Sequence, residues 1–206
     1  MTAAVRAARP AEAAAISALA LRSKAHWGYD PAFLEACRDD LTIRPEWCDG
    51  VRLVVAEQDG VLLGYARVAG EPPVGELAGL FVDPAAIGHG VGGLLLRHAV
   101  RIAAGLGMTA LEIESDPNAE PFYRHAGAVR TGESASTVDP IRLLPRLELA
   151  LPPSPAAQPG GPARRPSPTA QPGGPARAAQ PGRQDAGRSS GPPVRPPSGR
   201  AGDPPR

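Results

Sequence analysis

The chain has 206 residues, including 24 Gly and 26 Pro, and a formal net charge of +1 at pH 7. Sixteen of the prolines and a net charge of +6 (eight Arg and two Asp) fall in residues 152–206, which leaves −5 on residues 1–151. About 150 residues can bury a core without disulfides or metals, but a Pro/Gly-rich segment with one Val and no aromatic residue cannot offset its chain entropy. We therefore predict one globular domain, residues 1–151, and a disordered tail, residues 152–206.

Composition excludes several classes of protein. The acidic first part argues against nucleic acid as the main partner, because phosphate binding needs a basic face. No apolar run is long enough for a transmembrane helix, and the N-terminus lacks the pattern of a secretory signal, so we expect a cytoplasmic protein with no membrane contact. Cys37 and Cys48 have no Cys-x-x-Cys spacing and no clustered His nearby, which favours free thiols and no metal site. The excess of Arg (21, against the single Lys24) is interpreted as a coding preference and not as function.

Apolar spacing and the Gly/Pro breaks predict elements in the order β-α-α-β-β-β-α-β-α-β-β, a mixed sheet with helices on its faces. Asp30 before Pro31 is a good cap and first position for a helix. Asp59-Gly60 between two apolar runs is the strongest hairpin signal. In chain order the elements are a strand at 5–9, a helix at 11–24, a short helix after Asp30, strands at 51–57, 61–68 and 77–82, a helix at 94–104, a strand at 110–114, a helix at 118–126, and strands at 129–133 and 143–149.

A glycine-rich loop precedes the helix at 94–104. Gly88-x-Gly90-x-x-Gly93 matches the dinucleotide-binding fingerprint, but residues 83–87 separate it from the preceding strand, too many for the tight turn of that fold. No Lys-Ser/Thr pair follows, so it is not a Walker A loop either. The loop is still suited to bind an anion, because glycines allow close approach of a ligand and their amides lie at the positive end of a helix. We therefore expect a pyrophosphate there.

Two motifs resemble those of one enzyme family. Leu80-Phe81-Val82-Asp83-Pro84, followed by residues 88–95, is similar to motif A of the GNAT (GCN5-related) N-acetyltransferases, and residues 118–128 resemble their motif B. The resemblance covers about residues 3–151. It implies an α/β (α+β) fold with a mixed, mostly antiparallel central sheet and helices on both faces. It also implies acetyl-CoA as co-substrate, and a homodimer, since members of the family are often dimers.

The resemblance assigns the cofactor site residue by residue. The strand-end amides would contact the pantetheine and the acetyl group, and one of them would polarise the thioester carbonyl. Asn118 would bind the pantetheine arm and Tyr123 would protonate the departing thiolate, although Asn118 could instead cap a helix and Tyr123 could be a core aromatic. Ile87 stands where the family has Gln or Arg, so one side-chain contact with the cofactor is lost. The strand-end residues are Leu80, Phe81 and Val82, and the pyrophosphate loop comprises Ile87, Gly88, His89, Gly90, Val91, Gly92 and Gly93.

The acceptor side of the site is less defined. Glu76, at the start of the motif A strand, lies where many family members place a carboxylate, so it is a candidate base, with an exposed strand-end charge as the alternative. The loop between the first two helices, with His26, Trp27 and Tyr29, lies where the family builds its acceptor pocket; these side chains could also be structural. His89, inside the pyrophosphate loop, is expected to face solvent or phosphate.

These residues predict an N-acetyltransferase that moves the acetyl group of acetyl-CoA to a primary amine of a small molecule or protein, by direct attack in a ternary complex. Two alternatives stay open. One is a catalytically inactive acyl-CoA-binding sensor or regulatory module, and the other is a nucleotide-binding or interaction protein that uses the Arg/Pro tail. The net charge of −5 on the first 151 residues weakly favours a cationic acceptor.

Overall fold

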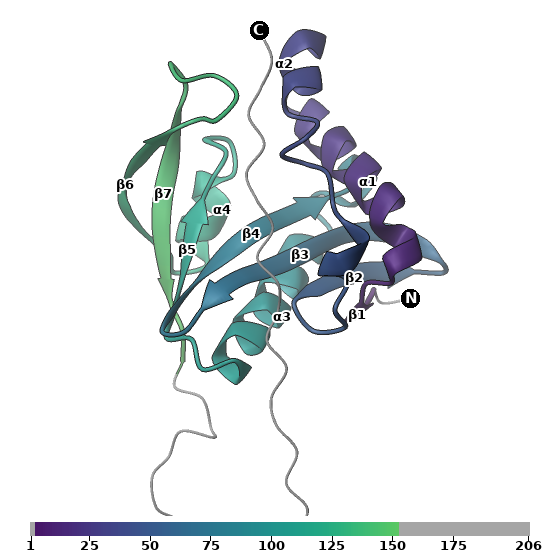
Figure 1. The fold of residues 1–206 in the computed structure, drawn as a ribbon, viewed down its shortest axis with the longest axis vertical. Helices are drawn as coiled ribbons and strands as arrows, with labels where there is room; N and C mark the ends of the chain where they lie inside the picture. The colour runs from purple at the N-terminus through teal and green to yellow at the C-terminus, as the bar shows by residue number, and fades with distance from the viewer. Residues whose placement is uncertain (1–2, 153–206) are drawn as a thin grey trace, which may run out of the picture. The chain divides into compact units, whose positions relative to one another are not determined.

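The computed structural model describes residues 3–152 of the chain (Figure 1). Apart from Pro152, the predicted disordered tail lies outside the described residues. The observed order of strands and α-helices matches the predicted one, with three short 3₁₀ turns added. The elements are β1 (Ala4–Ala7), η1 (Pro10–Glu12), α1 (Ala13–Ala25), α2 (Pro31–Ala36), η2 (Pro45–Trp47), β2 (Leu53–Gln58), β3 (Val61–Glu71), β4 (Val74–Val82), η3 (Pro84–Ala86), α3 (Val91–Gly105), β5 (Ala110–Glu114), α4 (Glu120–His125), β6 (Val129–Ala135) and β7 (Leu143–Ala150).

The seven strands form one sheet in the order β1-β2-β3-β4-β5-β7-β6. Every pair is antiparallel except β4 with β5. The sheet is buried between two clusters of apolar side chains, one against α3 and the other against α1. Strand β2 is buried on both faces, because Val54 and Ala56 pack in the first cluster while Leu53 and Val55 pack in the second. The predicted mixed, mostly antiparallel sheet with helices on both faces is thus confirmed.

The hairpin of β3 and β4 is longer than predicted. Asp59-Gly60 joins β2 to β3 as expected, but β3 runs on to Glu71 and β4 begins at Val74. The Gly and Pro residues between 70 and 75 have low strand propensity, and cross-strand pairing overrides it. As a correction to the prediction, Glu76 therefore lies inside β4 and not at its start.

The parallel pair β4–β5 is short, and the two strands then separate. Their pairing spans Val74 to Glu76 on β4, and Figure 1 shows the strands diverging beyond that point. The pairing of β3 with β4 skips Ala78, because Arg67 lies opposite Gly79 while Val68 lies opposite Leu77. A bulge of this kind bends the strand that carries it. The edge of β4 from residue 77 to residue 82 is thereby left without a strand partner on the β5 side.

A cluster of charged side chains connects β1, η1 and β2. The Arg6 guanidinium donates to both carboxylate oxygens of Glu12, at 2.9 and 2.7 Å, and to Glu57 on β2 at 2.7 Å. The backbone N–H of Arg9 also donates to Glu12, at 2.9 Å. The hydrogen bonds from Arg6, opposed by partial burial, lower the pKa of Glu12 to about 2. This carboxylate therefore links β1 to the start of α1.

Candidate functional site

A cavity of about 520 Å³ opens where β4 and β5 diverge. Its walls come from the last turn of α1, the free edge of β4, the glycine loop, the end of β5, and α4. Most of the site residues predicted from the sequence line it, and four do not. Those that line it are Trp27, Glu76, Leu80, Phe81, Val82, Ile87, Gly88, Gly90, Gly92, Gly93, Asn118 and Tyr123; the other four are His26, Tyr29, His89 and Val91.

The glycine loop leads into the N-terminus of α3. The helix begins at Val91, three residues before the predicted start, because the low helix propensity of the glycines conceals its first turn in the sequence. Gly90 is the N-cap and has a φ of 80°, a left-handed conformation that favours glycine. A glycine cap has no side chain to hydrogen-bond the first amides of the helix. These N–H groups are available to an anion, although Val91 itself turns its side chain into the core.

Ile87 and His89, two further predicted residues of the glycine loop, differ from the glycines in what they offer to an anion. Ile87 lines the cavity and is 37% exposed, and its aliphatic side chain offers no hydrogen-bond donor. The ring Nδ1 of His89 lies 3.1 Å from the carbonyl oxygen of Ile87, on the exposed side of the loop. Anion binding at this loop would therefore rest on backbone amides.

Tyr123 on α4 is buried, at 6% exposure, and lines the cavity. It meets Phe122 edge to face, with ring centroids 5.0 Å apart. Of the two rings, Tyr123 is the more buried. Its hydroxyl has no hydrogen-bond partner among residues 3–152. Burial raises the pKa of Tyr123 above its usual value, so the phenol stays protonated at neutral pH.

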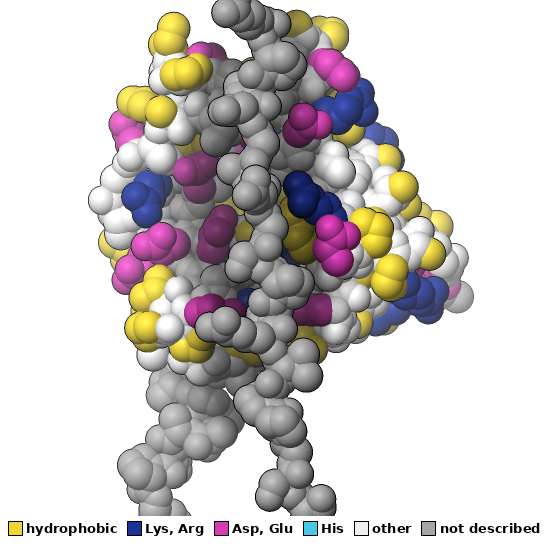
Figure 2. Space-filling model, in the orientation of Figure 1, with side chains coloured by type: hydrophobic (Ala, Val, Ile, Leu, Met, Phe, Trp, Pro, Cys, Tyr) yellow, Lys and Arg dark blue, Asp and Glu magenta, His cyan; other side chains and the backbone are white. Residues whose placement is uncertain are grey.

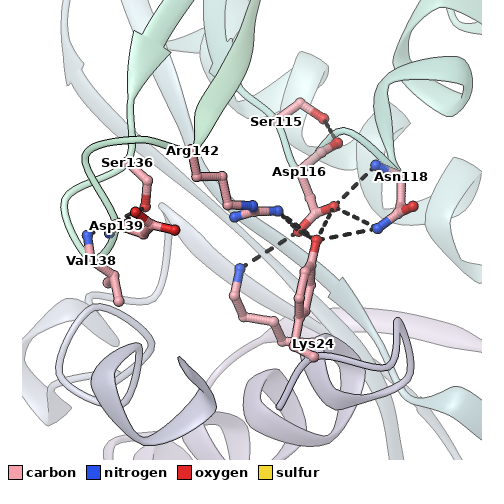
Figure 3. Close-up of polar contacts among 9 residues, drawn as sticks. Lys24, Ser115, Asp116, Asn118, Ser136, Val138, Asp139 and Arg142 are labelled. Carbon is pink, nitrogen blue, oxygen red and sulfur yellow. Dashed lines mark hydrogen bonds and ion pairs between the residues drawn. The ribbon is translucent and has the colours of Figure 1, made fainter. Parts of the chain in front are cut away.

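Asn118 belongs to a polar cluster that the sequence did not predict (Figure 3). Its side-chain Nδ2 donates to Asp116 at 3.1 Å and to the Tyr29 hydroxyl at 3.2 Å. The N-cap of α4 is Ala119, so Asn118 does not serve as a helix cap. Its side-chain carbonyl oxygen makes no hydrogen bond within the described part of the chain. That oxygen remains available to an N–H donor in the cavity.

Asp116, just beyond β5, is the centre of this cluster. Its carboxylate accepts from Tyr29 at 2.9 and 3.0 Å and from Arg142, on the β6–β7 connection, at 2.9 Å. Burial alone would raise the pKa of Asp116, but hydrogen bonds from the Asn118 backbone, Arg142 and Tyr29 outweigh it and lower the pKa. The cluster fixes the α1–α2 connection and the β6–β7 connection beside the cavity, and Tyr29 takes part in it without lining the cavity.

Lys24, from the last turn of α1, completes the cluster. Its Nζ lies 3.6 Å from an oxygen of Asp116 and 5.5 Å from the ring centroids of Tyr29 and Phe33. The side chain is 15% exposed and lines the cavity. Sequence reasoning treated this lysine as a by-product of composition. The signal that could have identified it is its rarity, because it is the single lysine in a chain with 21 arginines.

Carboxylates line the cavity on the strands. Glu76 on β4 and Glu114 on β5 are both exposed and border it. Ser134 donates to Glu114 at 2.5 Å, and Glu112, opposite Glu76 in the parallel pair, bonds Arg146 at 3.2 Å. Figure 2 shows acidic side chains gathered on this face over β5 and β7. The cavity therefore has carboxylates on its strand wall and an ammonium group at the end of α1.

The α1–α2 connection contributes one predicted residue to the cavity wall. Trp27 borders the cavity and is 43% exposed. His26 packs edge to face against Trp27, at 5.4 Å between ring centroids, and is itself exposed outside the cavity. Trp27 thus lies between His26 and the cavity.

Within residues 3–152, no group of three or more His, Cys, Asp or Glu side chains is arranged to hold a metal ion. Cys37 and Cys48 are free thiols, as predicted. None of the helices in the same range has the length and apolar character needed to cross a bilayer.

Sequence comparison yields a family and a relative. The family model described as the Acetyltransferase (GNAT) family matches residues 20–128, slightly more than half of the chain. The protein "Peptidyl-lysine N-acetyltransferase YjaB" of Salmonella typhimurium is 33% identical over 100 residues. The match covers 48% of this chain and 61% of that relative, so the chain spans less than two thirds of the relative's length.

Solved structures show the same fold. A GCN5-related N-acetyltransferase from Rhodopseudomonas palustris matches with a TM-score of 0.62 and 23% identity, over 73% of this chain and 97% of that one. PaiA N-acetyltransferase of Thermoplasma acidophilum, in complex with coenzyme A, matches with a TM-score of 0.58 and 15% identity, over 73% of this chain and 99% of that one. YncA of Salmonella typhimurium, with its cofactor acetyl-CoA, matches with a TM-score of 0.53 and 22% identity, over 80% of this chain and 99% of that one.

Proposed function

Because the chain belongs to the GNAT acetyltransferase family, we propose that it transfers the acetyl group of acetyl-CoA to a primary amine by direct attack in a ternary complex. One observation carries the proposal. A single cavity joins the free edge of β4, the uncapped N-terminus of α3 and the hydroxyl-bearing Tyr123. A thioester ligand with a pyrophosphate and an amide-containing arm needs these three features together.

The residues of the cavity suit each part of acetyl-CoA. The amides that begin α3 would bind the pyrophosphate, where the helix dipole favours negative charge. The free edge of β4 at Leu80, Phe81 and Val82 would hydrogen-bond the pantetheine arm and polarise the thioester carbonyl. The free carbonyl oxygen of Asn118 would accept from an amide N–H of the same arm.

Acetyl-CoA supplies an activated acetyl thioester. The amine nitrogen forms a bond to the acetyl carbon, the carbon–sulfur bond breaks, and the sulfur leaves with the electron pair. Tyr123, which lines the cavity, would donate its proton to that sulfur. The phenol is a weaker acid than a thiol in water, but the burial that raises the pKa of Tyr123 also disfavours an isolated thiolate in the cavity.

The amine must lose a proton as it attacks. Glu76 lies on the cavity wall with no hydrogen-bond partner among residues 3–152, so its carboxylate is free to accept that proton directly or through a water. His26 is outside the cavity, which makes Glu76 the better candidate for the base. The relative named as a peptidyl-lysine N-acetyltransferase makes a lysine side chain one candidate acceptor, beside small-molecule amines.

Calorimetric titration of acetyl-CoA into the full chain, with NADH as control, tests the cofactor assignment. We expect micromolar acetyl-CoA binding and no NADH binding. A matched pair of variants then locates the site: Gly90 and Gly60 both have a φ of 80° and open space where a Cβ would lie, but Gly60 is in the β2–β3 turn. Gly90→Ala should weaken acetyl-CoA binding about tenfold, and Gly60→Ala should lose similar stability, about 1 kcal/mol, without changing affinity.

Separate outcomes would contradict the cofactor site and the acetyl transfer. If acetyl-CoA does not bind, or binds equally well to both glycine variants and wild type, the glycine loop does not hold the pyrophosphate. If acetyl-CoA binds but no amine accelerates release of free coenzyme A, the chain is a sensor and not an enzyme.

A further inference from the structure

The ammonium group of Lys24 has unmet hydrogen-bonding capacity. It has three N–H donors, yet it makes no hydrogen bond within residues 3–152, and its nearest anionic atom is an Asp116 oxygen at 3.6 Å. The side chain is only 15% exposed, so bulk water reaches it poorly. A mostly buried charged group is costly unless it is paired and hydrogen-bonded. The ion pair with Asp116 leaves these donors unused, and the cavity that Lys24 lines is open to a ligand that would accept hydrogen bonds from them.

Asp116 is the ion-pair partner of Lys24, but the 3.6 Å separation is longer than a hydrogen bond and other donors already occupy the carboxylate. One oxygen accepts from the backbone and the side chain of Asn118 at 3.0 and 3.1 Å, and Tyr29 bridges both oxygens. The other oxygen accepts from Arg142 at 2.9 Å, which also neutralises the charge. One carboxylate thus faces two cations, and Lys24 is the surplus positive charge at this end of the cavity.

The strand wall of the same cavity has the opposite character. Glu76 and Glu114 line it, and neither forms an ion pair within the described residues. Glu76 is also the residue to which the proposed function assigns the proton of the attacking amine. A ligand that complements both the glutamates of the strand wall and Lys24 at the end of α1 would carry an amine for the carboxylates and an anionic group for the lysine.

We propose that the acceptor is a small zwitterionic amine of the amino-acid class, whose carboxylate binds the Lys24 ammonium while its amine lies toward Glu76. This inference rests on the proposed acetyl transfer and specifies its substrate class. Lys24 donates hydrogen bonds to the carboxylate, and the Tyr29 and Phe33 rings, whose centroids lie 5.5 Å from its Nζ, flank the ammonium group. Arg142 keeps Asp116 neutralised, so that the carboxylate of the acceptor meets a net positive charge.

The test compares free amino acids with their primary amides, which lack the anionic group. The full chain is assayed with acetyl-CoA and the twenty common amino acids, each beside its amide, and kcat/KM is measured. We expect the accepted amino acids to exceed their amides at least tenfold. In Lys24→Met, kcat/KM for the acids should fall 10- to 100-fold while the amides change less than twofold; Lys24→Arg should keep most of the preference.

Two controls separate this inference from a structural role and from the proposed function. Arg38→Met removes a surface cation whose partner is Glu35 and should leave both substrate series unchanged. The Kd of acetyl-CoA should be the same in wild type and Lys24→Met. Equal use of acids and amides by wild type, an equal loss for both series in Lys24→Met, or acetylation of no amino acid overturns the inference. Acetyl-CoA binding and transfer to other amines would then still uphold the proposed function.

Discussion

At the scale of single residues, the Tyr123 hydroxyl is the most specific chemical feature of the cavity. The side chain lines the cavity, and its oxygen, which is not fully enclosed, has no protein partner in the described residues, so it is free to hydrogen-bond a ligand. The raised pKa of Tyr123 keeps it a donor across the neutral range. A tyrosine with a purely structural role at this depth would be expected to hydrogen-bond the protein.

Replacing Tyr123 with Phe should lower kcat about 100-fold, the lower part of the range for loss of a general acid. The Kd of acetyl-CoA should stay within about twofold, because the ring and its contact with Phe122 remain. Thermal stability should not fall, since no intramolecular hydrogen bond is lost. Steady-state kinetics, calorimetry and thermal melting measure the three quantities. Full activity in the variant would remove Tyr123 from the proposed chemistry.

Sequence motifs predicted most of the residues that line the cavity but not the polar cluster beside it. The strand end, the glycine loop, Asn118 and Tyr123 lie in two local segments with recognisable spacing. Lys24 lies in the last turn of α1, Asp116 just beyond β5 and Arg142 on the β6–β7 connection, 92 and 26 residues apart along the chain. Their meeting depends on how the sheet brings α1, β5 and β7 together, which no local pattern encodes.

At the scale of elements, the Ala78 bulge shows the limit of strand patterns. Leu77 and Leu80 both pack on the α3 side of the sheet, although strict alternation would place residues three apart on opposite faces. The bulge is defined by the register of β3 against β4, and that register is not visible in either strand alone. The apolar run correctly predicted the strand, while the bend that opens the cavity could not be predicted.

The carboxylate of Glu12 should make the joint between β1 and α1 sensitive to acid. Because the pKa of Glu12 is lowered from 4.5 to about 2, its contribution is present above pH 4.5 and is lost as pH falls toward 2. Glu12→Gln should cost on the order of 1–2 kcal/mol at pH 7, after allowance for partial solvent screening of the pair. Urea unfolding at pH 7 and pH 2.5 measures this.

Two comparisons control the acid experiment. The difference between wild type and Glu12→Gln should shrink at pH 2.5, because Glu12 is then protonated in the unfolded chain and the pH is close to its folded-state pKa of about 2, so most of its contribution is lost. Glu35→Gln removes an exposed partner of Arg38 and should leave the urea midpoint unchanged. A Glu12→Gln deficit that is the same at both pH values would mean that shape and not charge is responsible.

At the scale of the whole molecule, we predict that residues 1–152 fold and bind acetyl-CoA without the rest of the chain. The cavity walls described above all lie in this range, and the last described contacts of the sheet are Ala150 opposite Ala110 and the Leu151 N–H donating to Thr109 at 2.9 Å. Melting temperature and acetyl-CoA Kd should match those of the full chain.

A shorter truncation provides the contrast. Ending the chain at Arg146 removes half of β7, including the core residues Leu147 and Leu149, and should prevent cooperative unfolding. If removal of residues 153–206 alone abolished acetyl-CoA binding, the division of the chain at residue 152 would be wrong, and the tail would have a part in the site.

The single lysine has a consequence for the chemical resistance of the protein. Thioesters acylate exposed lysine amines without a catalyst, whereas guanidinium groups stay protonated and do not react. With 21 arginines and one lysine that is 15% exposed, this surface offers, apart from the α-amino group, no accessible amine to the reagent it is proposed to carry. Apart from the α-amino group, uncatalysed acylation of amines by its own co-substrate is thereby confined to the cavity, and an amine-reactive label on Lys24 would report whether the cavity is occupied.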